Sequence, residues 1–161
     1  MMNPVPWLQM TNMISYQGLV RTFPRRDGEH RFVDLGSKTS SSVVELPCVV
    51  LQRVTSNEQP RRLVAASVSQ DVFEKYGGFV GENHVVIIEQ VIEAPILSPE
   101  DLVELLSSYA VERYFRCISG ATNVSAFELN QLALPDPLVL QRALNSGYTW
   151  DEAVVKGYQF E

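Results

Sequence analysis

At 161 residues, the chain is long enough for one domain with a substantial hydrophobic core. Hydrophobic residues make up 45% of it and charged residues 20%, as in an ordinary globular domain, and the apolar runs are too short to span a bilayer. The formal net charge of -6 differs from the strongly basic balance that is typical of nucleic-acid-binding domains. Since the N-terminus also lacks the basic and apolar regions of a signal peptide, we expect a cytoplasmic protein without membrane contact.

The first half of the chain is predicted to be mainly β. Segments 17–23 and 31–35 are expected to form a hairpin around the turn at 24–28, where Asp27-Gly28 suits positive φ. A second hairpin is expected from 47–54 and 62–67, with 55–60 as its loop. The β-branched run 85–88 is typical of a central strand that is buried on both faces.

The pattern becomes helical at Ser98, which is a good N-cap followed by Pro99 and by an acid at the capping-box position, Asp101. Apolar residues then recur at three- and four-residue spacing, which predicts one helix of about five turns that ends at Gly120. The stripe consists of Leu102, Leu105, Leu106, Tyr109, Ala110 and Tyr114.

Three further helical segments are expected. Ser125 and Glu128 form a second capping signal, Asp136 or Pro137 starts a helix toward residues 145–147, and residues 149–152 start a last turn or two. We therefore predict an α+β fold, with a twisted, mostly antiparallel sheet of five or six strands followed by a helical C-terminal part. Residues 1–161 are predicted to form one domain, mainly β over 1–93 and mainly helical over 94–161.

The sequence contains little catalytic chemistry. It has no phosphate-binding glycine loop, no His-Glu-x-x-His and no Gly-x-Ser-x-Gly. His84 next to Glu82 could be an acid/base pair, but a structural role is favoured, and a solvated helix start explains Glu100, Asp101 and Glu104 better than a metal site does. Cys48 and Cys117 lack metal or redox spacing, so we expect two buried free thiols.

Four blocks of sequence occur together in one order. They are Val49-Val50-Leu51-Gln52-Arg53 continuing to Arg61-Arg62-Leu63-Val64-Ala65-Ala66, then Gly81-Glu82-Asn83-His84, then Ser107-Ser108-Tyr109, and finally Phe115-Arg116-Cys117-Ile118-Ser119-Gly120-Ala121-Thr122-Asn123-Val124 leading to Leu134-Pro135-Asp136-Pro137. This series resembles the target-recognition region of adenine-specific DNA methyltransferases of type II restriction-modification systems. The likeness covers most of residues 4–137. It departs from the family at Gly120-Ala121-Thr122-Asn123, where a Gly-His-Thr-Gln run is common, and at Asn57, where a lysine is usual.

The resemblance implies a module that recognises a sequence in double-stranded DNA, next to a separate catalytic methyltransferase domain. The chain lacks the glycine-rich methyl-donor loop and the Asn/Asp-Pro-Pro-Tyr segment of such enzymes, so we expect no catalysis by this chain alone and no cofactor in it, with S-adenosylmethionine in the catalytic domain. The DNA-binding residues that follow are Arg53, Arg61, Arg62, Asn83, His84, Arg116, Ser119, Gly120, Thr122 and Asn123.

Each of these residues also has a simpler interpretation. The arginines at 53, 61 and 62 could contact phosphate or guanine, or could protect an exposed strand edge. The 119–123 loop could donate to phosphate or only cap a helix, Asn83 and His84 could reach bases or hold the fold, and Arg116 could bind phosphate or offset the negative end of its helix. Trp7, Phe23, Tyr114 and Phe127 are expected in the core rather than stacked on bases.

Two other functions fit the same residues. A specificity subunit of a multi-subunit restriction system uses similar modules, although it would need a second copy and long coiled-coil spacers. A protein-interaction or regulatory module with the same fold but without DNA binding would suit the charge distribution, since residues 1–66 carry eight Lys/Arg and five Asp/Glu, whereas residues 67–161 carry five and fourteen.

Overall fold

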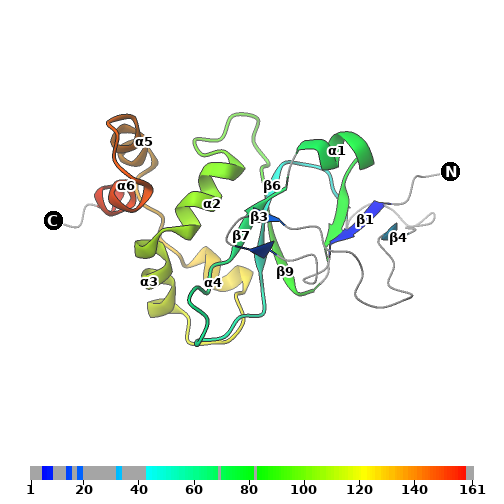
Figure 1. Cartoon of the computed structure of the whole chain (residues 1–161), viewed down its shortest axis with the longest axis horizontal. Coiled ribbons are helices and arrows are strands. Elements are labelled where there is room, and N and C mark those ends of the chain that lie inside the picture. The colour runs from blue at the N-terminus through cyan, green and yellow to red at the C-terminus, as the bar shows by residue number, and fades with distance from the viewer. Residues whose placement is uncertain are drawn as a thin grey trace.

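The computed structural model describes residues 43–68, 70–81 and 83–158, together with the backbone of four short strands at 5–8, 14–15, 18–19 and 32–33. Strands dominate the first part of the chain and helices the second, as Figure 1 shows, so the predicted α+β class is confirmed. Among the described residues, no helix is long and apolar enough to cross a membrane.

A three-stranded antiparallel sheet lies at the centre, in the order β7 (Ala65–Ser67), β6 (Cys48–Gln52) and β9 (Val85–Glu89). The second predicted hairpin is confirmed, because β6 pairs with β7 with Val50 opposite Ala66. The central strand, buried on both faces, is β6 rather than the expected run 85–88. This run lies in β9, at one edge of the three-stranded sheet, and its residues 86–88 are only partly buried.

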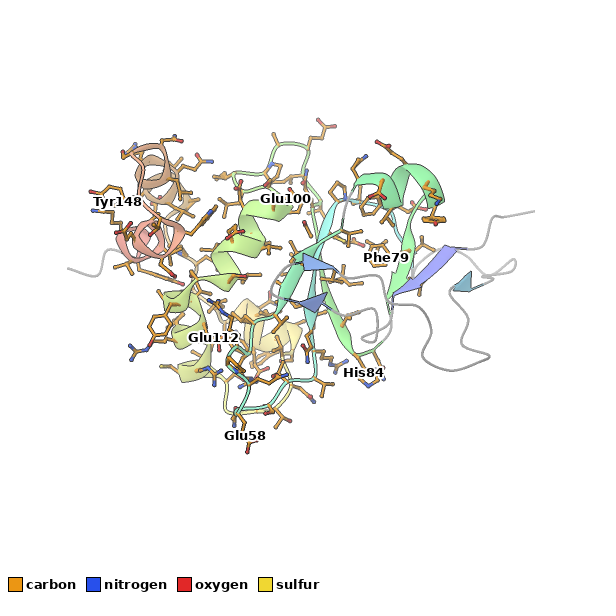
Figure 2. All side chains as sticks on the ribbon, in the orientation of Figure 1. Glu58, Phe79, His84, Glu100, Glu112 and Tyr148 are labelled. Carbon is orange, nitrogen blue, oxygen red and sulfur yellow. The ribbon has the colours of Figure 1, made fainter. Side chains whose placement is uncertain are left out.

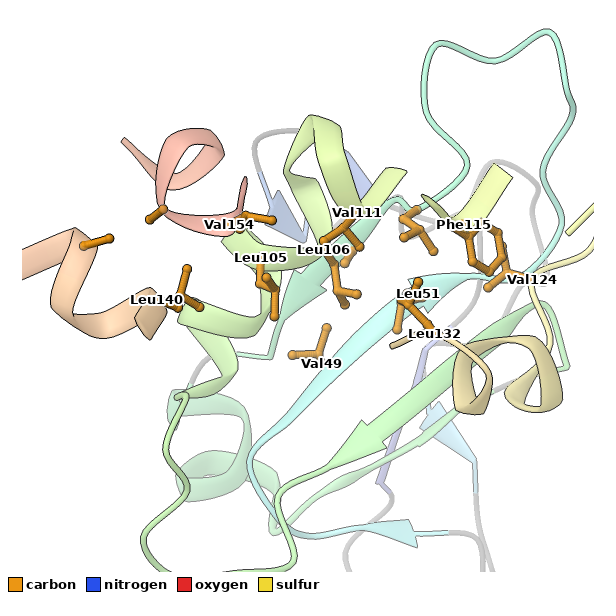
Figure 3. Packing of buried hydrophobic residues seen from close by; sticks show 14 residues of the cluster. Val49, Leu51, Leu105, Leu106, Val111, Phe115, Val124, Leu132, Leu140 and Val154 are labelled. Atoms are coloured by element: carbon orange, nitrogen blue, oxygen red, sulfur yellow. The ribbon is translucent and has the colours of Figure 1, made fainter. Parts of the chain in front are cut away.

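Alternation along β6 supplies two hydrophobic clusters, because neighbouring strand residues point to opposite faces. Val49 and Leu51 face the helices, whereas Cys48 and Val50 face the other cluster, which includes Phe79. Figure 3 shows the helical side, where Leu105, Leu106, Val111 and Phe115 pack over β6 with Val124 and Leu132. This packing fixes the helices on one face of the sheet.

The remaining described strands form a four-stranded sheet in the order β4 (Phe32–Val33), β1 (Val5–Leu8), β8 (Phe79–Gly81) and β5 (Val43–Val44), and a pair of β2 (Ile14–Ser15) with β3 (Gly18–Leu19). The first predicted hairpin was wrong in its pairing, because β3 pairs with β2 and β4 pairs with β1. Its turn, and the side chains of Trp7 and Phe23, lie outside the described residues. Strands β1 and β8 are parallel.

A helix that we did not predict, α1 (Gln70–Tyr76), lies between β7 and β8. It ends at two glycines with positive φ, Gly77 at 73° and Gly78 at 147°. A Cβ at Gly78 would lie 2.5 Å from the Val44 carbonyl oxygen, so only glycine lets the chain approach β5 this closely.

The expected five-turn helix is two helices, α2 (Pro99–Ser107) and α3 (Tyr109–Ile118). Ser108 separates them with ψ of 149°, because its hydroxyl accepts from the amide of Val111 and its own amide donates to the carbonyl of Leu105. The Asp151 carboxylate, which belongs to the last helix of the chain, accepts a hydrogen bond from the Tyr109 amide at 2.6 Å and stabilises the break between the two helices. The break turns Tyr109 outward, to 62% exposed, although we expected it in the buried stripe.

Four helices, α2 and the last three, begin where the sequence predicts. Capping boxes start α2 at Ser98, α4 (Ala126–Asn130) at Ser125 and α6 (Trp150–Gly157) at Thr149, and Asp136 caps α5 (Pro137–Asn145). The C-cap of α3 is Ser119 rather than Gly120. Cys48 is buried as expected, but Cys117 and Phe127, which is 74% exposed, were wrongly expected in the interior. Tyr114 is partly buried, edge-on to Tyr158.

Candidate nucleic-acid interface

Three segments that are far apart in the sequence meet at one end of the central sheet. They are the loop between β6 and β7, the turn at 83–84 before β9, and the loop at 119–125 between α3 and α4. Backbone hydrogen bonds join them: the amide of Arg53 donates to the carbonyl of His84 at 2.8 Å, and the amide of Val124 donates to the carbonyl of Arg53 at 2.7 Å. The two loops lie side by side at the lower edge of Figure 1. We call this surface, formed by residues 53–61, 83–84 and 120–123, the candidate edge.

Arg53 occupies the middle of the candidate edge. Both of its backbone polar groups are bonded to neighbouring segments, while its side chain is exposed and donates from Nη1 to the carbonyl oxygen of Asn83 at 3.1 Å. Within the described part of the chain, this bond leaves the other guanidinium donors available, and it orients the group. The backbone at Arg53 is therefore held firmly, while the Arg53 side chain, the most exposed of the predicted arginines, extends into solvent.

The other exposed predicted residues lie in the segments that meet at the candidate edge. Asn83, Gly120, Thr122 and Asn123 are exposed, and His84 is partly buried. Figure 2 shows His84 and Glu58 toward the same lower edge, with Glu100 and Tyr148 far from it. Residues from blocks about 30 and 70 positions apart in the sequence are thus brought onto one surface.

Arg62 is placed differently from the prediction, because its side chain is fully buried. Its Nε donates to the Thr55 hydroxyl at 2.8 Å, its Nη1 donates to the Ser119 carbonyl at 3.2 Å, and its guanidinium lies 5.4 Å from the centre of the Phe115 ring. Burial lowers the pKa of Arg62 from its ordinary value, against the opposing effect of nearby Glu128 and Glu112. The surface roles that we weighed for Arg62, in DNA contact or strand protection, do not fit this position.

Arg116 and Ser119 are also engaged within the protein. Arg116 donates from Nε to the Glu112 carboxylate at 2.6 Å, and its terminal nitrogens donate to the backbone carbonyls of Asn57, Gln59 and Pro60. Ser119 is 3% exposed and donates from Oγ to Glu128 at 2.5 Å. These two residues therefore hold the hairpin loop and the α3–α4 loop in position.

Glu112 is the centre of this network and was missed by the sequence analysis. It is 4% exposed, and its carboxylate accepts from the backbone amides of Arg62 and Leu63 and from the side chain of Arg116. The only sequence signal for it is the four-residue spacing to Arg116, which is that of an ion pair on one helix face. Its contacts with the hairpin span about 50 residues and have no local signature.

Glu128 closes the network on the α4 side. Burial alone would raise the pKa of this carboxyl, but hydrogen bonds from Ser119 and Ser125 outweigh it and hold the pKa below its ordinary value. The group is therefore charged near neutral pH and accepts hydrogen bonds only.

Arg61 lies next to this network and is partly buried. Its Nη1 atom is enclosed and has no hydrogen-bond partner in the described part of the chain, so some of its donor capacity is unused.

No group of three His, Cys, Asp or Glu residues that could hold a metal ion occurs among the described residues.

Comparison with known proteins adds one short match. A stretch of 33 residues is 70% identical to Protein YghO of Escherichia coli (strain K12), which corresponds to 20% of this chain and 8% of that protein. The chain thus spans a small fraction of this curated relative, whose name states no activity. No family model matches the chain, and no solved structure matches it.

Proposed function

We propose that the chain is a target-recognition module for double-stranded DNA, belonging to an adenine-specific DNA methyltransferase of a restriction-modification system. The observation that carries this proposal is the convergence of Arg53, Asn83, Thr122 and Asn123 on the candidate edge. The side chains come from three of the sequence blocks that resemble the methyltransferase recognition region, and each is exposed.

The chemistry of the candidate edge suits both parts of DNA recognition. Guanidinium and hydroxyl groups contact phosphates and set the position of a protein on the duplex, whereas arginine and asparagine side chains distinguish bases in the major groove. Arg53 and Thr122 supply the first kind of group, and Arg53, Asn83 and Asn123 the second. Base recognition would be done here, while a separate catalytic domain would bind the methyl donor and extrude the target adenine.

Among the described residues, few basic side chains reach this surface, and that number sets the expected strength of binding by this part of the chain. Arg62 and Arg116 are used inside the protein, which leaves Arg53 and Arg61 as the Arg and Lys residues of the candidate edge in the described part of the chain. Two neutralised phosphates give a slope of about -2 in a plot of log affinity against log salt concentration. We therefore expect weak binding by the module alone and a shallow salt dependence.

A second candidate function, a protein-interaction module, is favoured by the loop at 90–98. Val91 is 78% exposed, Ile92 58% and Ile96 52%. The segment 89–104 that contains this loop has five acidic residues and no Lys or Arg, so it would suit a basic partner and would repel DNA.

Fluorescence anisotropy with a random-sequence duplex, measured at several salt concentrations, separates the two functions. For DNA recognition, affinity should fall with salt, and Arg53→Ala should reduce the slope by about 1. Arg142→Ala is the matched control, since Arg142 is exposed on α5, away from the candidate edge. Absence of binding at low salt, or equal effects of the two substitutions, would contradict the proposal.

A further inference from the structure

Val54 and Asn123 form an isolated antiparallel bridge at the candidate edge. The bridge is flanked by two backbone hydrogen bonds, from the Thr55 amide to the Thr122 carbonyl at 2.9 Å and from the Val124 amide to the Arg53 carbonyl at 2.7 Å. Bonds in this arrangement make Val54 and Asn123 a non-hydrogen-bonded pair, in which the two side chains lie close together on the same face. An apolar side chain and an amide are thus held next to each other.

On the opposite face of this short ribbon, Thr55 and Val124 anchor it in the protein. Thr55 is 5% exposed and Val124 is fully buried, whereas Val54 is 40% exposed and Asn123 is exposed. The Thr55 hydroxyl donates to the Thr122 carbonyl and accepts from the buried Arg62, so both strands of the ribbon are tied to the interior. The Val54–Asn123 face is therefore presented outward from a rigid support.

This pair matches one edge of a base pair. In the major groove, adenine offers the N7 acceptor and the N6 donor, which an asparagine amide bonds with two hydrogen bonds, and its partner thymine offers a methyl group to apolar side chains. The groove is wide enough for a two-stranded ribbon. Since asparagine satisfies the adenine and valine covers the methyl group, the two residues together suit an A·T pair better than a G·C pair.

We propose that Val54 and Asn123 are specificity-determining residues that recognise one A·T pair in the major groove, with Asn123 on the adenine and Val54 on the thymine methyl group. This inference rests on the proposed function and extends it from DNA binding to the chemistry of one base pair. It concerns a base pair contacted by this module, distinct from the adenine that a catalytic domain would extrude.

The test begins with a duplex selected from a random-sequence pool by the wild-type chain. Each thymine of the selected site is replaced in turn by deoxyuridine, which lacks the methyl group, and each adenine by 7-deazaadenine, which lacks the N7 acceptor. At one A·T pair, we expect deoxyuridine to weaken wild-type binding about fourfold, the value of one buried methyl group. The 7-deazaadenine at the same pair should weaken it by about tenfold.

Variants assign the two effects to the two residues. Val54→Ala should lose the response to deoxyuridine and keep the response to 7-deazaadenine, and Asn123→Ala should do the reverse. Since the bridge is formed by backbone groups, both variants should fold as the wild type does. Val155→Ala on α6 and Asn145→Ala on α5 are matched controls at exposed positions and should keep both responses.

Two results would overturn the inference, and they can be told apart. If a site is selected but no thymine or adenine replacement acts through Val54 or Asn123, the inference fails while the proposed function stands. If the pool yields no preferred sequence, the proposed function fails, and the inference fails with it.

Discussion

The substitution Glu112→Ala should destabilise the protein strongly, because it removes the acceptor at the centre of the buried network. The backbone amides of Arg62 and Leu63 would lose bonds of 2.9 to 3.0 Å, and Arg116 would lose one of 2.6 Å. Each buried donor left without a partner costs about 1–3 kcal/mol, and removal of one member of a buried charged pair costs about 3–5 kcal/mol.

Two corrections reduce the total. The side chain of Arg116 is 32% exposed, so water can replace part of its lost bond, and alanine has a helix propensity better than that of glutamate by a few tenths of a kcal/mol. We therefore expect the free energy of unfolding to fall by about 3–5 kcal/mol. Because whole domains are stable by only about 5–15 kcal/mol, this change would be large.

Urea denaturation, followed by circular dichroism and by tryptophan fluorescence, measures this difference. Coincidence of the two signals would support a two-state transition. The control is Glu104→Ala on α2, an exposed helical position where we expect a change within about 0.5 kcal/mol. Glu112→Gln keeps one oxygen acceptor and should fall between them, and it serves if the alanine variant does not fold.

The expected order of stability is wild type, then Glu112→Gln, then Glu112→Ala. If Glu112→Ala unfolded at the same urea concentration and with the same slope as Glu104→Ala, the network would not hold the hairpin loop on α3. The assignment of Arg62 and Arg116 to structural roles would then be wrong.

Three further results are expected. Phe115→Ala should lower the free energy of unfolding by about 3–5 kcal/mol because Phe115 is fully buried, whereas Phe127→Ala, at a 74% exposed position, should change it little. Similar losses for the two variants in urea titrations would contradict the burial of Phe115 in the core. A thiol reagent should modify the exposed Cys117 in the native protein but the buried Cys48 only after unfolding, because burial raises the pKa of Cys48 to about 12. Fast reaction of both thiols in the native protein would refute this prediction. The pKa of Glu128 is lowered in the folded state, so its stabilising contribution is complete above the unfolded-state pKa and is lost as the pH falls through the folded-state pKa. Glu128→Gln should therefore make the urea midpoint less sensitive to acid. If the pH dependence of the midpoint stayed the same, the hydrogen bonds to Glu128 would not stabilise the fold as described.

Local features of the fold could be predicted because they depend on neighbouring residues. Ser98, Ser125 and Thr149 each precede an acid by three residues, and each caps a helix in the structure. The hairpin of β6 and β7 follows from two β-rich runs around a polar loop.

The errors arose where distant contacts decide the structure. No glycine or proline marks the break at Ser108, and the Asp151 carboxylate that caps the following helix lies about 40 residues away. Arg61 and Arg62 are adjacent and identical in chemistry, yet Arg62 is the one that is buried and bonded to Thr55 and Ser119 in the interior. Their different burial depends on α3 and the loop that follows it.

The candidate edge was predictable in composition but not in arrangement. The resemblance selected Arg53, Asn83, Thr122 and Asn123 as candidate DNA-binding residues, and these four lie on one surface, whereas Arg62, Arg116 and Ser119 of the same set are engaged within the protein. The bridge between Val54 and Asn123 joins positions about 70 residues apart, so Val54 had no sequence signal for a role there. Only the three-dimensional pairing identifies the apolar member of this pair.

Sequence selection from a random duplex pool, carried out at low salt with the purified chain, tests the central claim most directly. If the chain is a recognition module, one short sequence should be enriched over successive rounds, and Arg53→Ala should lose part of that preference while Arg142→Ala keeps it. A pool that stays random, although the protein remains folded, would contradict DNA recognition by this chain.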